Sequence, residues 1–216
     1  MSDSDTLLVC SLENGPDKNN CWWLVSLSRN CSEWREAQRV QTEGTGRISC
    51  ALSDSRVLIG QYNTTHMELF RVESGPRIER VHRIHVPEKY RWFFATCGSD
   101  TLVAMCYPKD SYSLNSDNSV LVHRLRGDQL EELARIQLKE PWRLLLLADR
   151  LLVADYEREK KSHAVVELKV NDTRLERRRK LIATSENIEV YRMCAMNNGI
   201  AIVDNKSKDI LHYSFA

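Results

Sequence analysis

The stretch Leu144-Leu145-Leu146-Leu147-Ala148-Asp149-Arg150-Leu151-Leu152-Val153-Ala154 decides the fold of this chain. Two apolar runs flank a short polar step that contains Asp149. Aspartate hydrogen-bonds to its own backbone and tolerates left-handed geometry, which makes it a turn former. The stretch therefore predicts a β-hairpin, in which two antiparallel strands are joined by a tight turn.

The same pattern recurs along the chain with a nearly constant period. The turn residues are Asp5, Asp54, Asp100, Asp149 and Asn198, which are separated by 49, 46, 49 and 49 residues. A third run with alternating polarity and a fourth, highly charged run follow the hairpin. These runs predict repeats of four strands at approximately residues 4–44, 47–88, 91–140, 142–186 and 190–216.

The fourth run of the third repeat is ambiguous when it is considered alone. Leu130, Leu133, Ala134 and Ile136 have the spacing of an amphipathic helix. The corresponding run at residues 175–183 contains four consecutive basic residues and has no apolar helical stripe. The comparison between repeats therefore favours a strand.

Antiparallel strands that repeat every 45 to 50 residues, with an apolar first and a charged fourth strand, resemble the blades of β-propeller repeat proteins. The resemblance covers essentially the whole chain and is of the WD40-like or YVTN-like kind. No repeat carries the Trp-Asp or Gly-His of WD40 blades, a kelch Gly-Gly or a Tyr-Trp-Thr-Asp motif, so no sub-family is assigned. The resemblance implies an all-β fold: a single β-propeller domain over residues 1–216 with about five four-stranded repeats, buried first strands and solvent-facing fourth strands.

The two end repeats are expected to be incomplete, because the first lacks its first strand and the last lacks its fourth. Three interpretations stay open. The chain is a fragment or spliced form of a larger propeller, a strained five-bladed ring, or an open arc. An open arc would expose apolar residues such as Leu144 to Leu147, and we then expect an oligomer or missing strands supplied by another chain.

Composition excludes several classes of protein. The chain contains 31 Lys and Arg residues and 30 Asp and Glu residues, which gives a net charge of +1. This near-neutral charge indicates no nucleic-acid partner. No apolar run approaches the roughly 18 residues of a membrane helix, so no membrane partner is expected. The N-terminus has no pattern of a secretory signal, which predicts a cytoplasmic protein. Seven cysteines are too few and odd in number for a disulfide framework, and we expect buried thiols at Cys50, Cys97, Cys106 and Cys194.

No catalytic residue, cofactor or metal site is predicted from motifs. The chain contains neither a C-x-x-C pair nor a glycine-rich phosphate loop. The basic cluster at Arg174 and residues 177–180 has no interleaved aromatic residues, which favours a solvated outer strand.

The residues that open the first strands form the candidate partner-binding site. In a propeller these positions gather at one mouth of the central channel, and tryptophan with arginine is typical of interaction hot spots. Packing of the aromatic rings between blades is the alternative. The candidate residues are Arg47, Trp92, Trp142, Arg143, Tyr191 and Arg192.

The predicted function is a non-catalytic interaction platform that binds a protein or peptide partner through one propeller face. Three loops join second to third strands and lie on one rim, at residues 14–20, 107–118 and 156–161. The alternative is a propeller hydrolase of the lactonase-like or glycosidase-like kind, which the lack of acidic residues in the first strands disfavours. A truncated propeller fragment without independent function is a third hypothesis.

Overall fold

The computed structural model describes residues 6–14, 20–30, 33–42, 45–51, 55–62, 66–72, 77–85, 94–97, 102–107, 118–147, 150–171, 174–182 and 188–215. Within these ranges the chain is built from strands, and the helical segment there is the short 3-10 turn η3 (Arg158–Lys160). This confirms the predicted all-β class. No helix in the described ranges is long and apolar enough to cross a membrane.

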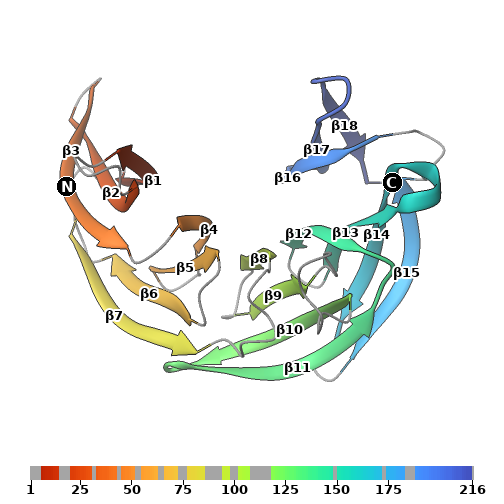
Figure 1. Cartoon of the computed structure of the whole chain (residues 1–216), viewed down its shortest axis with the longest axis horizontal. Helices are drawn as coiled ribbons and strands as arrows, with labels where there is room; N and C mark the ends of the chain where they lie inside the picture. The colour runs from red at the N-terminus through yellow and green to blue at the C-terminus, as the bar shows by residue number, and fades with distance from the viewer. Residues whose placement is uncertain are drawn as a thin grey trace. The chain divides into compact units, whose positions relative to one another are not determined.

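The described strands form five antiparallel sheets in which strand order follows chain order (Figure 1). The first two sheets are β1 (Thr6–Asn14), β2 (Asn20–Asn30), β3 (Glu33–Thr42), and β4 (Thr45–Ala51), β5 (Arg56–Tyr62), β6 (His66–Val72), β7 (Ile78–His85). The next two are β8 (Phe94–Cys97), β9 (Leu102–Tyr107), β10 (Ser119–Arg126), β11 (Gln129–Gln137), and β12 (Pro141–Leu147), β13 (Arg150–Glu157), β14 (Ser162–Val170), β15 (Leu175–Ile182). The last is β16 (Val190–Met196), β17 (Gly199–Asp204), β18 (Ile210–Ser214). The predicted repeats are thus each one sheet, and the ambiguous segment is strand β11.

The chain divides into two compact units. Unit one comprises residues 1–91 with 127–129, and unit two comprises residues 92–126 with 130–216. Unit one contains the first two sheets, and unit two contains the other three apart from the β10–β11 turn. The single-domain organisation stays a prediction.

Each unit has its own apolar core. In unit one, Leu24, Val57, Ile59, Phe70 and Ile78 pack between the first two sheets. Unit two has two clusters. One joins the sheet β8–β11 to the sheet β12–β15 and includes Ala104, Val122, Leu151, Val153 and Val166. The other joins β12–β15 to β16–β18 and includes Leu152, Val165, Ile188, Ile200 and Ile202. Alternate residues of β13 therefore enter different clusters, as the two-residue period of a strand requires.

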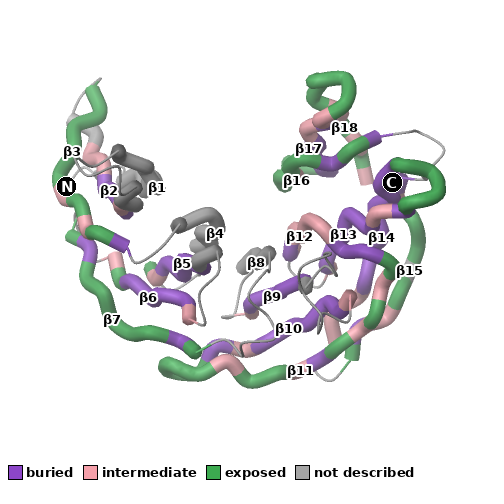
Figure 2. The backbone as a smooth tube through the Cα atoms, viewed as in Figure 1, coloured by how far each residue is buried: buried purple, intermediate pink, exposed green. Residues whose placement is uncertain are grey.

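The burial gradient differs from the prediction. The most buried strands are middle strands such as β13, β14 and β17, whereas the first strand β12 is half-buried and the first strand β16 is largely exposed (Figure 2). A middle strand has a hydrogen-bonded neighbour on both sides, while a first strand ends the sheet on one side. The expectation of buried first strands was therefore wrong for β12 and β16, and the side chains of β1, β4 and β8 lie outside the described residues. The prediction for the fourth strands is confirmed on β15, where Arg177, Arg179 and Lys180 are exposed.

The prediction of buried cysteines is confirmed for Cys106 and wrong for Cys194. Cys106 is fully buried on β9, as expected. Cys194 is exposed, because it lies on the first strand β16 rather than in the middle of its sheet. The side chains of Cys50 and Cys97 lie outside the described residues.

The predicted turn is observed at the last repeat. Asn198 lies in a two-residue turn between β16 and β17, and its carbonyl accepts the Phe215 N–H at 2.8 Å. Asp5, Asp54, Asp100 and Asp149 lie outside the described residues.

Candidate functional site

The candidate site is a cavity within unit two, at the end of the sheets where β12 and β16 begin. Its volume is about 450 Å³, and it is lined by Trp142, Arg143, Tyr156, Lys161, His163, Glu189, Val190, Tyr191 and Asn205. Small-molecule sites in proteins typically have volumes of about 300–1,000 Å³. The cavity is therefore large enough for a small ligand.

Two equivalent aspartates hold the strands that enter this site. Asp155 at the end of β13 accepts the Glu140 N–H at 2.7 Å, and Asp204 at the end of β17 accepts the Glu189 N–H at 2.8 Å. The members of the two pairs are 49 residues apart, which is the period of the repeat. Burial raises the pKa of Asp155. Burial also opposes ionisation of Asp204, but hydrogen bonds from backbone N–H groups and from Ser207 lower its pKa on balance. Each bond fixes the start of a first strand against the end of the second strand of its own sheet.

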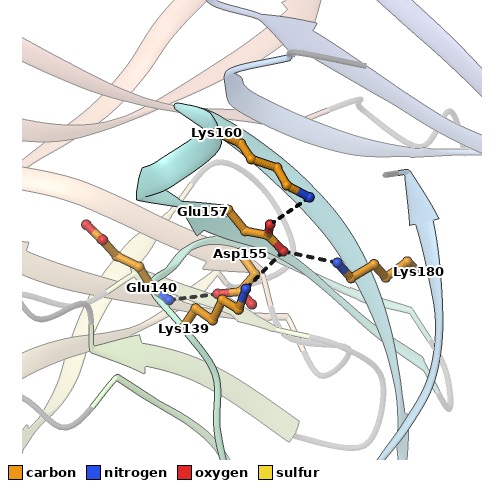
Figure 3. A network of polar contacts seen from close by, with 6 residues as sticks. All are labelled: Lys139, Glu140, Asp155, Glu157, Lys160 and Lys180. Carbon is orange, nitrogen blue, oxygen red and sulfur yellow. Dashed lines mark hydrogen bonds and ion pairs between the residues drawn. The ribbon is translucent and has the colours of Figure 1, made fainter. Parts of the chain in front are cut away.

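A second set of contacts holds the turn between β13 and β14. Glu157 is buried and accepts Lys180 Nζ at 3.0 Å, with Lys139 Nζ at 3.3 Å and Lys160 Nζ at 3.4 Å (Figure 3). The hydrogen bond from Lys180 lowers the pKa of Glu157 to about 2, so the carboxylate stays ionised. Because the three lysines come from three different segments, the contacts fix the turn that carries Lys161.

His163 is the most informative residue in the lining, with 5% of its surface exposed. Its Nδ1 accepts the Val190 N–H at 3.1 Å, and its backbone N–H donates to the Ile188 carbonyl at 2.9 Å. An accepting Nδ1 places the ring proton on Nε2. Nε2 is buried and has no hydrogen-bond partner among the described residues. Burial lowers the pKa of His163 to about 4, so the imidazole is neutral near pH 7. The site thus contains a neutral N–H donor for which the described part of the chain supplies no acceptor.

Arg143 and Tyr191 form a stacked group at the cavity wall. Arg143 Nε donates to the Tyr191 carbonyl at 2.8 Å, and its guanidinium carbon lies 5.9 Å from the centroid of the Tyr191 ring. The Arg192 guanidinium carbon lies 5.7 Å from the same centroid. Burial lowers the pKa of Arg143, and the charge of Arg192 lowers it further. The tyrosine ring therefore interacts with two arginine cations.

The structure brings together part of the predicted binding set. Trp142, Arg143 and Tyr191 line the cavity, and Arg192 stacks beside them on Tyr191. Arg47 belongs to β4 in unit one and its side chain is outside the described residues, as is the whole of Trp92.

Sequence reasoning missed the rest of the lining, namely Tyr156, Lys161, His163, Glu189, Val190 and Asn205. A signal existed for some of them. The sequence predicts a rim loop at residues 156–161, and Glu140 and Glu189 are 49 residues apart. Nothing distinguished His163 from the other five histidines.

The lining has an excess of positive charge. Arg143 and Lys161 are its cations, while Glu189 is its acid and accepts Asn205 Nδ2 at 3.0 Å. In the described part of the chain, no group of three or more His, Cys, Asp or Glu side chains is arranged to hold a metal ion. The chemistry available in the lining is hydrogen-bond donation, cationic charge and one carboxylate.

No protein-family model matches this chain, and no curated protein matches its sequence. Solved structures resemble it at low identity. A protein from Lactobacillus plantarum has a TM-score of 0.62 and 13% identity, with 99% of this chain and 68% of that one covered. A candidate 6-phosphogluconolactonase from Bacteroides fragilis has a TM-score of 0.61 and 9% identity, with coverages of 100% and 78%. A catalytically inactive histidine-to-alanine variant of virginiamycin B lyase from Staphylococcus aureus, with quinupristin, has a TM-score of 0.57 and 11% identity, with coverages of 95% and 65%.

At these identities the likeness shows the fold alone. The chain has an all-β fold of the β-propeller type, and it spans about two thirds of the length of several of these structures.

Proposed function

We propose that the protein is a propeller-type enzyme that opens an ester or lactone bond of a small molecule bound in the cavity. The observation that carries this proposal is the neutral, unpartnered Nε2–H of His163 in a cavity that also contains Arg143 and Glu189. Two of the similar structures are a candidate lactonase and a lyase, which supports an enzymatic function for this fold type. For the fold itself we propose about five WD40-like or YVTN-like repeats with incomplete first and last blades.

The three side chains supply complementary parts of a hydrolysis. A buried N–H donor polarises a carbonyl group and stabilises the negative charge that develops on its oxygen. His163 supplies this donor, and the Arg143 cation adds to the stabilisation. Glu189, which is exposed and is hydrogen-bonded by Asn205, accepts a proton from water.

The proposed reaction consumes one water molecule. The water oxygen forms a bond to the carbonyl carbon while its proton passes to the Glu189 carboxylate. The bond between that carbon and the leaving oxygen then breaks, and the leaving oxygen takes the proton from Glu189. The products are an acid and an alcohol, joined in one molecule if the substrate is a lactone.

The test is a pH-stat assay of acid release from a panel of simple lactones and aryl esters. We expect wild-type protein to accelerate hydrolysis, and H163F to lose about 100-fold or more, the usual effect of removing one oxyanion donor. H123F is the matched control, because His123 is similarly buried but lies outside the cavity. If H163F does not fold, as judged by its melting curve, H163L, which also has no side-chain N–H donor, replaces it. A folded wild-type protein that hydrolyses none of the panel, or a His163 variant as active as wild type, would refute the proposal.

A non-catalytic interaction platform is the second candidate function. It is favoured by Tyr191, which is 49% exposed while its ring contacts Arg143 and Arg192. Exposed tyrosine with arginine is a typical composition of binding hot spots. A screen of displayed peptides against wild type and Y191A tests this candidate. Peptides that bind wild type and not Y191A, together with no hydrolysis, would favour the platform over the enzyme.

A further inference from the structure

The cavity lining combines three aromatic rings with a surplus of positive charge. From this combination we infer that the substrate is an ester or lactone carrying an aromatic ring and a carboxylate. The inference rests on the proposed function, because it names the substrate class for the same cavity.

Lys161 supplies the strongest argument for an anionic substrate. Its ammonium group makes no hydrogen bond or ion pair with the described residues, although it lines the cavity. Its backbone has φ of 49°, in the left-handed region that lysine rarely adopts. The Glu157 contacts described above hold this turn, so the cation is kept at the cavity wall in an unfavourable backbone conformation.

The acids near the cavity offset only part of its positive charge. Glu140 accepts Arg158 Nε at 2.6 Å, so it is already paired with another cation. Glu189 contributes one negative charge, which the hydrogen bond from the neutral Asn205 amide does not remove. With Arg143 and Lys161 against Glu189, the lining has a formal charge of +1. The Nε2–H of His163, which has no hydrogen-bond partner among the described residues, adds a neutral donor. A substrate carboxylate pairs with the Lys161 ammonium, which leaves the His163 N–H and Arg143 for the reacting carbonyl oxygen.

The aromatic side chains of the lining are the argument for an aromatic ring in the substrate. The Trp142 indole N–H donates to Glu140 Oε1 at 3.4 Å, which restrains the indole ring. The Tyr156 ring lies 5.0 Å from the His163 ring, centroid to centroid. With Tyr191 they give the cavity three flat side chains, against which an aromatic ring stacks favourably.

Binding of three probes to the full chain tests the inference by isothermal titration calorimetry. The probes are 2-naphthoate, its uncharged analogue 2-naphthamide, and cyclohexanecarboxylate, which keeps the charge without the aromatic ring. We expect 2-naphthoate to bind at least about tenfold more tightly than either analogue, which corresponds to about 1.4 kcal/mol. Equal affinity for the naphthamide would overturn the carboxylate requirement, and equal affinity for cyclohexanecarboxylate would overturn the aromatic requirement.

Two variants of Lys161 connect the binding to the cavity. K161G removes the cation and also suits the left-handed backbone, so the fold is expected to survive. It should weaken 2-naphthoate about tenfold and leave 2-naphthamide unchanged. K161R keeps the charge and should retain binding. An unchanged affinity of K161G for 2-naphthoate would contradict the assignment of the anion site.

Hydrolysis of 4-acetoxybenzoate and its methyl ester separates this inference from the proposed function. Faster turnover of the free acid supports both. Selective binding of 2-naphthoate without turnover of any ester supports the ligand class and refutes catalysis. Turnover of esters with no preference for the charged aromatic substrate supports catalysis and refutes the ligand class.

Discussion

Replacing His123 and His163 by glutamine should remove most of the acid sensitivity of this protein between pH 7.5 and 5. Burial lowers the pKa of each imidazole from 6.5 to about 4. The unfolded chain therefore binds protons as the pH falls below about 6.5, whereas the folded chain binds them only near pH 4. Because the unfolded state binds more protons in this interval, the free energy of unfolding decreases as the pH is lowered.

The size of the effect follows from the shift in pKa. A shift from 6.5 to about 4 corresponds to about 3 kcal/mol for each histidine when the transition is complete, at about 1.4 kcal/mol per pKa unit. At pH 5 only part of the transition has occurred, and each histidine accounts for about 2 kcal/mol. We therefore expect a loss of about 4 kcal/mol for the wild-type protein between pH 7.5 and 5.

Urea denaturation at the two pH values measures this loss for wild type, H123Q, H163Q and the double variant. Each single variant should lose about 2 kcal/mol less than wild type, and the double variant should lose very little. Glu157 does not interfere, because its pKa falls from 4.5 to about 2 and its contribution is lost only in stronger acid. Burial raises the pKa of Asp155, which acts in the opposite direction, and D155N corrects for it. A double variant as acid-sensitive as wild type would refute the assignment of the two buried neutral imidazoles.

Three further predictions concern packing and backbone geometry. L152A should cost about 2–5 kcal/mol in urea denaturation, because Leu152 is fully buried between two sheets, whereas I210A should change stability by less than about 0.5 kcal/mol because Ile210 is 61% exposed. G199A should separate β18 from β17, since the added Cβ would overlap the Tyr213 carbonyl oxygen; hydrogen exchange of the β18 amides would reveal the loss, and unchanged protection would contradict it. D204A should lower the free energy of unfolding by about 1–3 kcal/mol, because the buried carboxylate satisfies backbone N–H groups, and a stability equal to wild type would show that these groups find other acceptors.

The strands were predictable because their signal repeats. The secondary structure of a single amphipathic segment such as residues 129–137 is ambiguous. Comparison with the corresponding segments of the other repeats favours a strand, which is observed as β11. The Asn198 turn was predictable for the same reason, since turn chemistry is local. The burial of the first strands was not predictable from the sequence, because it depends on which other segments cover the edge of each sheet. The exposure of Cys194 follows from the same tertiary effect.

The candidate site was predictable only where its residues open a first strand. Trp142 and Tyr191 occupy corresponding positions in the period, as do Arg143 and Arg192. The structure places Trp142, Arg143 and Tyr191 on one cavity. His163 could not be found in this way, because its importance depends on an acceptor contact with the Val190 N–H of the next sheet. Such a contact joins residues 27 positions apart and leaves no motif in the sequence.

The proposed chemistry depends on the tautomer and charge of His163, which long-range ¹H–¹⁵N NMR of the imidazole nitrogens measures at pH 7. The spectrum is assigned by comparison with H163Q. We expect a neutral ring protonated on Nε2, whose Nε2 resonance shifts when 2-naphthoate is added. A ring protonated on Nδ1, a charged imidazolium, or resonances unaffected by saturating 2-naphthoate would contradict the proposed chemistry.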